Sequence, residues 1–214
     1  MLWRFNRGIR AMQKFSEMGL SAPKSIARLY EVGPDKLSFS MEYFPEGDLQ
    51  KLARLRLSLK ARLEIFREVL EAVSFAHKNG VIHRDIKPAN ILVRRDRSIA
   101  LTDFDISDLV YAQTNSYSGA GMGSPQFAAP EQLIGDALSA HPSADVFSLG
   151  KLLYFLMTES VPPIGGIEPN AMPAYLNKVE LPRARQAIAL ALQNEPENRP
   201  QTVDALAKHS GLWV

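Results

Sequence analysis

The sequence predicts an α+β fold, in which a small start containing strands leads into a mostly helical body. Two runs of β-type residues, 26–32 and 37–43, flank a turn at residues 33–35 that contains glycine and proline. Apolar residues recur at helical spacing through most of the later sequence. These two patterns favour a strand pair followed by packed helices.

The helical stretches are bounded by residues that start or stop helices. The expected helices cover residues 4–17, 58–78, 143–157, 182–193 and 202–209. Asn79 and Gly80 follow the long second helix, where glycine is typical of a helix end. Ser143 is expected to cap the third helix, because a serine side chain can accept a hydrogen bond from the first turn.

Residues 81–130 contain short β-type runs and a long loop in place of helical periodicity. Short β-type runs stand at 81–82, 91–93 and 99–101, the last two separated by a turn over residues 94–97. Residues 105–130 are rich in glycine, serine, threonine, asparagine and alanine and show little periodicity. A loop of that length inside a compact domain is usually functional or disordered.

Composition narrows the class of protein. The 214 residues suffice for one large domain or two small ones, with the 46% hydrophobic content of a soluble globular protein. A net charge of +2 gives no strong field for nucleic acid or a membrane, so neither is expected as a partner. The absence of cysteine excludes disulfides, thiolate catalysis and cysteine zinc sites.

No apolar run approaches the ~20 residues that span a bilayer, and the start lacks the apolar region of a signal peptide. A cytoplasmic location is therefore expected, although an exported protein with an unrecognised signal would have the same features.

The first segment that carries chemistry is residues 83–90, His-Arg-Asp-Ile-Lys-Pro-Ala-Asn. The segment resembles the catalytic loop of eukaryotic-type serine/threonine protein kinases. The spacing suits the chemistry that this resemblance implies, because a carboxylate at Asp85 can meet a substrate hydroxyl while the amide oxygen of Asn90, five residues later, can reach a metal on the phosphate side. The resemblance implies that Asp85 is the catalytic base, that Lys87 lies near the γ-phosphate of ATP, and that Asn90 binds Mg²⁺.

Two neighbours of Asp85 have implied roles of their own. His83 is expected to be a packed structural residue rather than a general base. Arg84 resembles the arginine of kinases whose activation loop is phosphorylated, because a guanidinium can pair with phosphate. Candidate phosphorylation sites in the loop that follows are Thr114, Ser116, Tyr117 and Ser118.

A second segment, residues 102–105, resembles the D-F-G motif of the same family. It implies that Asp103 is the main Mg²⁺ ligand and that Phe104 is a packing element. Asp105 replaces the family's glycine, and aspartate adopts positive φ angles less readily than glycine does. Metal binding by Asp103 can survive this change, whereas we expect the segment to lose flexibility.

A third segment, residues 123–131, is similar to the end of the kinase activation segment, with Ser124 and Phe127 in place of threonine and tyrosine. The resemblance implies that Glu131 pairs with Arg199. It also implies that Asp145 braces the catalytic loop.

Residues 41–44 look like the gatekeeper and hinge, whose backbone, at Glu42 and Phe44, would hydrogen-bond adenine. Leu92 resembles the floor of the adenine site. Asp48 either touches ribose or caps a helix.

The resemblance covers almost the whole chain and implies a remnant small lobe over residues 1–44, with the family's C helix, two strands and hinge, and a large helical lobe over 45–214. The glycine-rich loop and the lysine of the small lobe are absent. Gly8 stands where the C helix normally carries a glutamate, and Glu17 lies too far along to replace it. The chain is then either a piece of a longer kinase or a reduced kinase-like protein. A partner chain or self-association could cover its open, apolar nucleotide cleft.

The function that these residues favour is ATP- and Mg²⁺-dependent phosphoryl transfer to a serine or threonine of a protein substrate. The alternative is a pseudokinase, a binding or scaffolding module that keeps the fold without turnover. A small-molecule phosphotransferase of similar fold is a weaker alternative, because such enzymes usually lack the Lys-Pro pair and the A-P-E segment.

Overall fold

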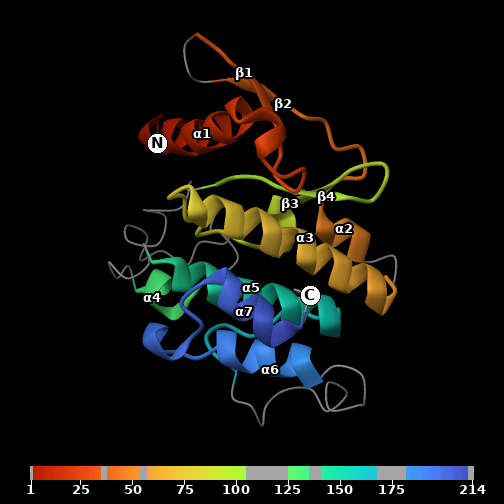
Figure 1. Ribbon diagram of the computed structural model, residues 1–214, viewed down its shortest axis with the longest axis vertical. Coiled ribbons are helices and arrows are strands. Elements are labelled where there is room, and N and C mark those ends of the chain that lie inside the picture. Colours follow the sequence, from red (N-terminus) through yellow and green to blue (C-terminus); the bar gives the residue numbers. More distant parts are fainter. Residues whose placement is uncertain are drawn as a thin grey trace. The chain divides into compact units, whose positions relative to one another are not determined.

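The computed structural model describes residues 2–34, 38–53, 57–104, 125–134, 141–167 and 182–211, and for residues 2–8 it describes the backbone alone. The chain divides into two compact units, residues 1–108 and 109–214. The expected boundary between lobes near residue 44 remains a prediction. The regular secondary structure of the described residues consists of helices and two small antiparallel sheets, which agrees with the expected α+β class (Figure 1).

The first unit begins with helix α1 (Leu2–Glu17), which buries Ile9, Met12 and Phe15. It packs against strand β1 (Leu29–Val32), which pairs antiparallel with β2 (Phe39–Met41) (Figure 1). A short 3-10 helix, η1 (Gly19–Ser21), follows α1. The strand pair is therefore confirmed.

Both strands are shorter than the sequence predicts. Ile26 lies outside β1 because it forms an isolated parallel bridge with Leu101. Leu37, in the expected second strand, lies outside the described residues.

Two helices follow, and the side chain before each of them accepts a hydrogen bond from the first turn. Asp48 precedes α2 (Leu49–Ala53) and accepts a hydrogen bond from the Lys51 N–H at 3.0 Å, which supports its capping role. Ser58 caps α3 (Leu59–Lys78) through a bond from the Ala61 N–H at 3.3 Å. The long helix is confirmed at both ends.

The segment after α3 carries the second sheet. The 3-10 helix η2 (Pro88–Asn90) leads into β3 (Ile91–Val93), which pairs antiparallel with β4 (Ile99–Leu101). The expected strand at residues 81–82 is wrong. The Val81 N–H instead closes the end of α3 by donating to the Ala76 carbonyl at 2.9 Å.

The second unit is helical in its described residues. Its elements are α4 (Pro130–Leu133), α5 (Pro142–Thr158), α6 (Pro182–Ala191), the 3-10 helix η6 (Pro196–Asn198) and α7 (Val203–Ser210). Helices α6 and α7 pack against α5 and each other. Gly150 on α5 allows this, because a Cβ there would lie 2.6 Å from the Cβ of Ala191.

The cap of α5 differs from the prediction. His141, not Ser143, is the cap, and its Nδ1 accepts a hydrogen bond from the Ser143 N–H at 3.3 Å. Pro142 explains the difference, because proline is favoured at the first helical position, which makes His141 the cap, two residues before Ser143. Across the described ranges, no helix is long and apolar enough to cross a membrane.

Candidate active site

The loop between α3 and β3 closes around the carboxylate of Asp85. Lys87 donates to Asp85 Oδ2 from Nζ at 2.7 Å, and the Asn90 amide nitrogen donates to the same oxygen at 2.9 Å. Asn90 also donates to the Asp85 backbone carbonyl at 2.8 Å. Three predicted site residues thus form one hydrogen-bonded cluster, in which the Asp85 side chain is held in a single orientation.

Asn90 is oriented by these bonds. Its Nδ2 donates two hydrogen bonds within the loop, which leaves Oδ1 as the atom that can accept a hydrogen bond or bind a cation. Its backbone carbonyl accepts a hydrogen bond from the Thr102 N–H at 3.0 Å, so the loop is tied to the end of β4. Asp103 is the next residue after Thr102, which donates this hydrogen bond.

Asp103 has an electrostatic environment that favours a bound cation. Burial raises the pKa of its carboxyl, and the neighbouring Asp85 raises it further, while His83 and Lys87 act in the opposite direction. A divalent cation would relieve this cost by stabilising the ionised form. The carboxylate of Asp103 and the amide oxygen of Asn90 are ligands that suit Mg²⁺.

A metal at this site would share its coordination with phosphate. Among the described residues, no group of three or more His, Asp or Glu could hold a metal ion by itself. Mg²⁺ commonly binds through one or two carboxylates together with substrate phosphates, so two protein ligands are enough.

Two residues of the site have a strained backbone. Arg84 and Asp103 have φ angles of 67° and 61°, in the left-handed region that residues other than glycine seldom occupy. Such conformations cluster at functional sites, where the surrounding structure holds them in place.

His83 is packed and not poised as a base. It is fully buried, its ring lies 4.7 Å from that of Phe104, and its Nε2 lies 2.9 Å from the Thr102 carbonyl oxygen. Phe104 in turn meets Phe15 of α1 edge-on at 5.3 Å. The structural role expected for both residues is supported, and the aromatic cluster joins α1 to the catalytic loop.

The expected hinge lies beside β3. Asp48 forms a bridge with Leu92, and the Val93 N–H donates to the Gly47 carbonyl at 2.8 Å. Leu92 is half-buried, whereas its neighbours Ile91 and Val93 are fully buried. Because side chains alternate along a strand, Leu92 faces away from the core. The structure therefore places the expected adenine floor alongside Gly47 and Asp48, which follow the expected hinge.

Glu42 at the hinge has a partner that the sequence did not indicate. Its carboxylate accepts hydrogen bonds from Nε and Nη2 of Arg94, the latter at 2.9 Å, and Arg94 lowers the pKa of this carboxyl. The Glu42 N–H donates to the Arg28 carbonyl at 2.8 Å. An arginine in a turn 52 residues away gives no local pattern from which this pair could have been predicted.

Comparison with known proteins gives the family. A protein kinase domain profile matches residues 6–209. The chain is 30% identical to the serine/threonine-protein kinase PknB of Mycobacterium leprae, over 87% of this chain and 34% of that protein. It is 34% identical to PknB of Mycobacterium tuberculosis (80% of this chain, 30% of that protein). It is also 34% identical to the mouse NUAK family SNF1-like kinase 1 (88% and 29%).

The chain belongs to the protein kinase family. It spans about a third of the length of the curated relatives it matches. Its fold is that of a kinase whose small lobe is reduced, with α1 and the β1–β2 pair among the described residues.

One departure from other kinases lies on α1. By helical spacing, Gly8 is one turn before Met12 and two turns before Phe15, both of which are buried. It therefore shares a stripe with Phe15, which meets Phe104, and the expectation that the family's glutamate belongs at this position remains a prediction. Glu17 is exposed at the last residue of the helix and cannot replace it. The other departure, Asp105, lies outside the described residues.

The kinase ion pair predicted in the second unit is confirmed. Arg199 donates to both oxygens of Glu131, at 2.7 and 2.9 Å, and both side chains are almost fully buried. Asp145 is fully buried on α5, while its expected brace to the catalytic loop remains a prediction. Ser124 and the four candidate phosphorylation sites lie outside the described residues.

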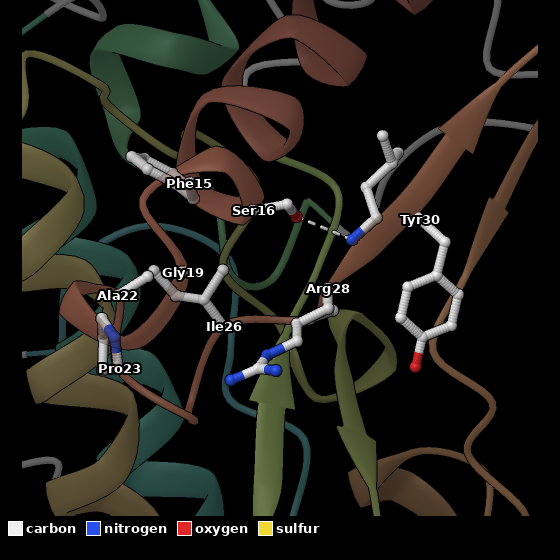
Figure 2. Close-up of a pocket in the computed structure, with 10 residues that line it drawn as sticks. Phe15, Ser16, Gly19, Ala22, Pro23, Ile26, Arg28 and Tyr30 are labelled. Atoms are coloured by element: carbon white, nitrogen blue, oxygen red, sulfur yellow. Dashed lines mark hydrogen bonds between the residues drawn. The ribbon is translucent and has the colours of Figure 1, made fainter.

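A cavity of about 190 Å³ lies elsewhere in the first unit, between the end of α1 and β1 (Figure 2). Its lining includes Ser16, which accepts a hydrogen bond from the Leu29 N–H at 2.8 Å, and Arg28 and Tyr30, whose side chains are exposed. None of the predicted kinase site residues lines it. The candidate active site is therefore defined by its side-chain cluster and not by this cavity.

Proposed function

We propose that this chain transfers the γ-phosphoryl group of ATP, with Mg²⁺, to a serine or threonine hydroxyl of a protein substrate. The observation that carries the proposal is the cluster of Asp85, Lys87 and Asn90, with Asp103 beside it. A structural role would not require a base, a cation and two metal-binding oxygens at one place.

Each member of the cluster has a role that its geometry supports. Asp85 accepts the proton of the substrate hydroxyl, and its hydrogen bonds from Lys87 and Asn90 orient the carboxylate. Lys87 offsets negative charge on the transferred group. Asp103 and Asn90 Oδ1 hold Mg²⁺, which when bound neutralises charge on the phosphate oxygens.

The hinge supplies the adenine contacts in this proposal. Glu42 and Phe44 present backbone groups to the base, and Leu92 packs against its face. Within the described residues the Phe44 N–H donates no hydrogen bond, so it is available to a ligand. The Glu42 side chain does not take part, because Arg94 holds it.

A pseudokinase is the second candidate. It is favoured by the absence of a described carboxylate on the stripe of α1 that meets Phe104, together with Gly8 at the family's glutamate position. Loss of the glutamate from the ion pair that orients the phosphates would reduce turnover by orders of magnitude without abolishing nucleotide binding.

Calorimetric titration of Mg²⁺-ATP into the parent chain and Asp103→Asn tests the site. We expect the parent to bind and the variant, which lacks the main metal-binding carboxylate, to lose Mg²⁺-dependent binding. Asp96→Asn, in the exposed turn between β3 and β4, is the matched control and should bind as the parent does.

The outcomes separate the two candidates. Binding followed by phosphate transfer to a protein substrate supports the kinase, whereas binding without transfer supports the pseudokinase. Failure of the parent to bind at millimolar nucleotide would exclude autonomous kinase activity.

A partner chain or second copy over the nucleotide site, and a cytoplasmic location, remain parts of the proposal. The first is supported by aromatic side chains at the β1–β2 pair and the hinge, where Tyr30 and Tyr43 are 68% and 83% exposed. Sedimentation of the chain over a range of concentrations tests for self-association, and a monomer at all concentrations would exclude it.

A further inference from the structure

Arg94 follows the end of β3, two residues after Leu92, and its guanidinium contacts four residues in three separate parts of the first unit. It donates to the carboxylate of Glu42, to the Lys24 carbonyl at 2.8 Å and to the Ile99 carbonyl at 2.9 Å. It also lies over the ring of Phe44, 5.4 Å from the centroid. All three guanidinium nitrogens are therefore used.

We propose that Arg94 is a positioning residue for adenine recognition, an inference that rests on the proposed function. It holds the hinge (residues 42–44) against the β3–β4 hairpin. The edge of the adenine site, formed by hinge backbone, and its floor, formed by Leu92, are thereby fixed relative to each other.

The contacts restrain both ends of the hinge. Glu42 is held through its carboxylate and through its N–H bond to Arg28, and Phe44 is held through its ring. Tyr43 between them is exposed. Restraint at both ends orients the backbone groups that face the base before nucleotide arrives, and such preorganisation lowers the ordering cost of binding.

The Arg94–Glu42 ion pair is buried enough to restrain the hinge. The side chains of Arg94 and Glu42 are each only 19% exposed, so water and salt screen their attraction less than that of a surface pair. A lysine could not replace the arginine, because a single ammonium cannot form the planar fork that meets both carboxylate oxygens and stacks on an aromatic ring.

Nucleotide fragments separate this role from a general effect on the site. Dissociation constants for Mg²⁺-ATP, adenosine and Mg²⁺-tripolyphosphate are measured on the parent, Arg94→Met, Arg94→Lys and the control Arg95→Met, which changes the exposed neighbouring arginine. Urea unfolding of each variant shows that it is folded under the assay conditions.

We expect Arg94→Met to weaken ATP and adenosine roughly tenfold, as befits loss of preorganisation, and to leave tripolyphosphate unchanged. Arg94→Lys should restore little of the lost affinity for ATP and adenosine. Arg95→Met should bind every ligand as tightly as the parent does. Glu42→Gln should weaken ATP less, and adding it to Arg94→Met should add almost nothing, because both changes break the same pair.

Three results would overturn the inference. Equal weakening of tripolyphosphate and adenosine would show that Arg94 supports the whole site and not the hinge. A parent that binds ATP and an Arg94→Met variant that binds it equally well would refute the positioning role and leave the proposed function standing. A parent that binds no adenine compound would refute both.

Discussion

Asp85 is the residue on which the proposed chemistry depends most. Its Oδ2 receives hydrogen bonds from Lys87 and Asn90. We expect Asp85→Asn to lower kcat by about 10²–10⁴, the usual contribution of a general base, because an amide cannot take up the hydroxyl proton. The Kd of Mg²⁺-ATP should change little, since Asp103 and Asn90 Oδ1 keep their places.

Steady-state kinetics with a protein substrate and nucleotide titration check this prediction together. Asp96→Asn is again the control, because it removes one aspartate from an exposed turn. Parallel losses of kcat and nucleotide affinity would contradict the assignment, since they would show that Asp85 organises the metal site instead of acting as a base.

The sequence was informative at this scale where function depends on a contiguous string. Asp85, Lys87 and Asn90 lie within six positions, so the loop that joins them also brings them together. Arg94 and Glu42 are 52 residues apart, and only the packing of the hinge on β3 makes them neighbours. Such pairs need tertiary structure, because no local periodicity marks them.

At the scale of elements, Arg199 joins several parts of the second unit. Besides Glu131 on α4, it donates to the Gln193 and Asn194 carbonyls at 2.7 and 2.6 Å, and it lies 4.8 Å from the Phe147 ring centroid on α5. We expect Arg199→Met to lower the free energy of unfolding by about 3–5 kcal/mol, because it leaves Glu131 buried and unpaired.

Urea unfolding measures this loss. Arg199→Lys should recover only part of it, because lysine cannot form the two-pronged bond. The double variant Arg199→Met with Glu131→Met should be more stable than Arg199→Met alone, since the uncompensated charge is gone. A double variant as unstable as the sum of the two single variants would contradict this account.

Helix α5 also carries a fully buried lysine. Lys151 donates from Nζ to the Pro163 carbonyl at 2.6 Å and to the Gly165 carbonyl, and it lies 5.3 Å from the Phe147 ring centroid. Burial lowers the pKa of this ammonium to about 8. The lysine therefore fixes the loop after α5 at the cost of holding a charge away from water.

The pH dependence of stability follows from that pKa. Below about pH 8 the lysine is protonated in both states, and between there and its unfolded value of 10.5 only the unfolded state holds the proton. Stability should therefore rise with pH across this window, by at most about 3 kcal/mol.

Comparison of the parent with Lys151→Met by urea unfolding, at about pH 7 and about pH 10, isolates this effect. The free energy of unfolding of the parent should rise relative to that of Lys151→Met as pH rises. Lys208→Met, which removes an exposed lysine from α7, controls for loss of a charge. A difference between parent and Lys151→Met that does not change with pH would refute the prediction.

Element boundaries show what sequence patterns can and cannot give. Helix α3 was predicted at both ends because its apolar periodicity and its terminal Asn-Gly pair agree, and the structure adds a Ser58 cap at its start. The run at 81–82 has strand-forming residues, yet no described strand pairs with it, and its Val81 N–H instead closes the end of α3. A strand depends on a neighbour that sequence periodicity alone does not supply.

At the scale of the whole chain, every residue proposed to bind nucleotide lies in the first compact unit. A bound ligand stabilises the part of the protein that must open before the ligand can leave, by about 2.7 kcal/mol at a ligand concentration of 100 times Kd. If the two units open separately, that stabilisation is confined to the first.

Hydrogen exchange with and without Mg²⁺-ATP tests this expectation. Protection should rise by about a hundredfold for amides of α3, β3 and β4 that exchange through opening of the site, and much less for α6 and α7. Asp103→Asn, which loses the metal ligand, should show no increase anywhere. An equal rise in α6 and α7 would show that the two units open together, so that ligand binding in the first stabilises the entire chain.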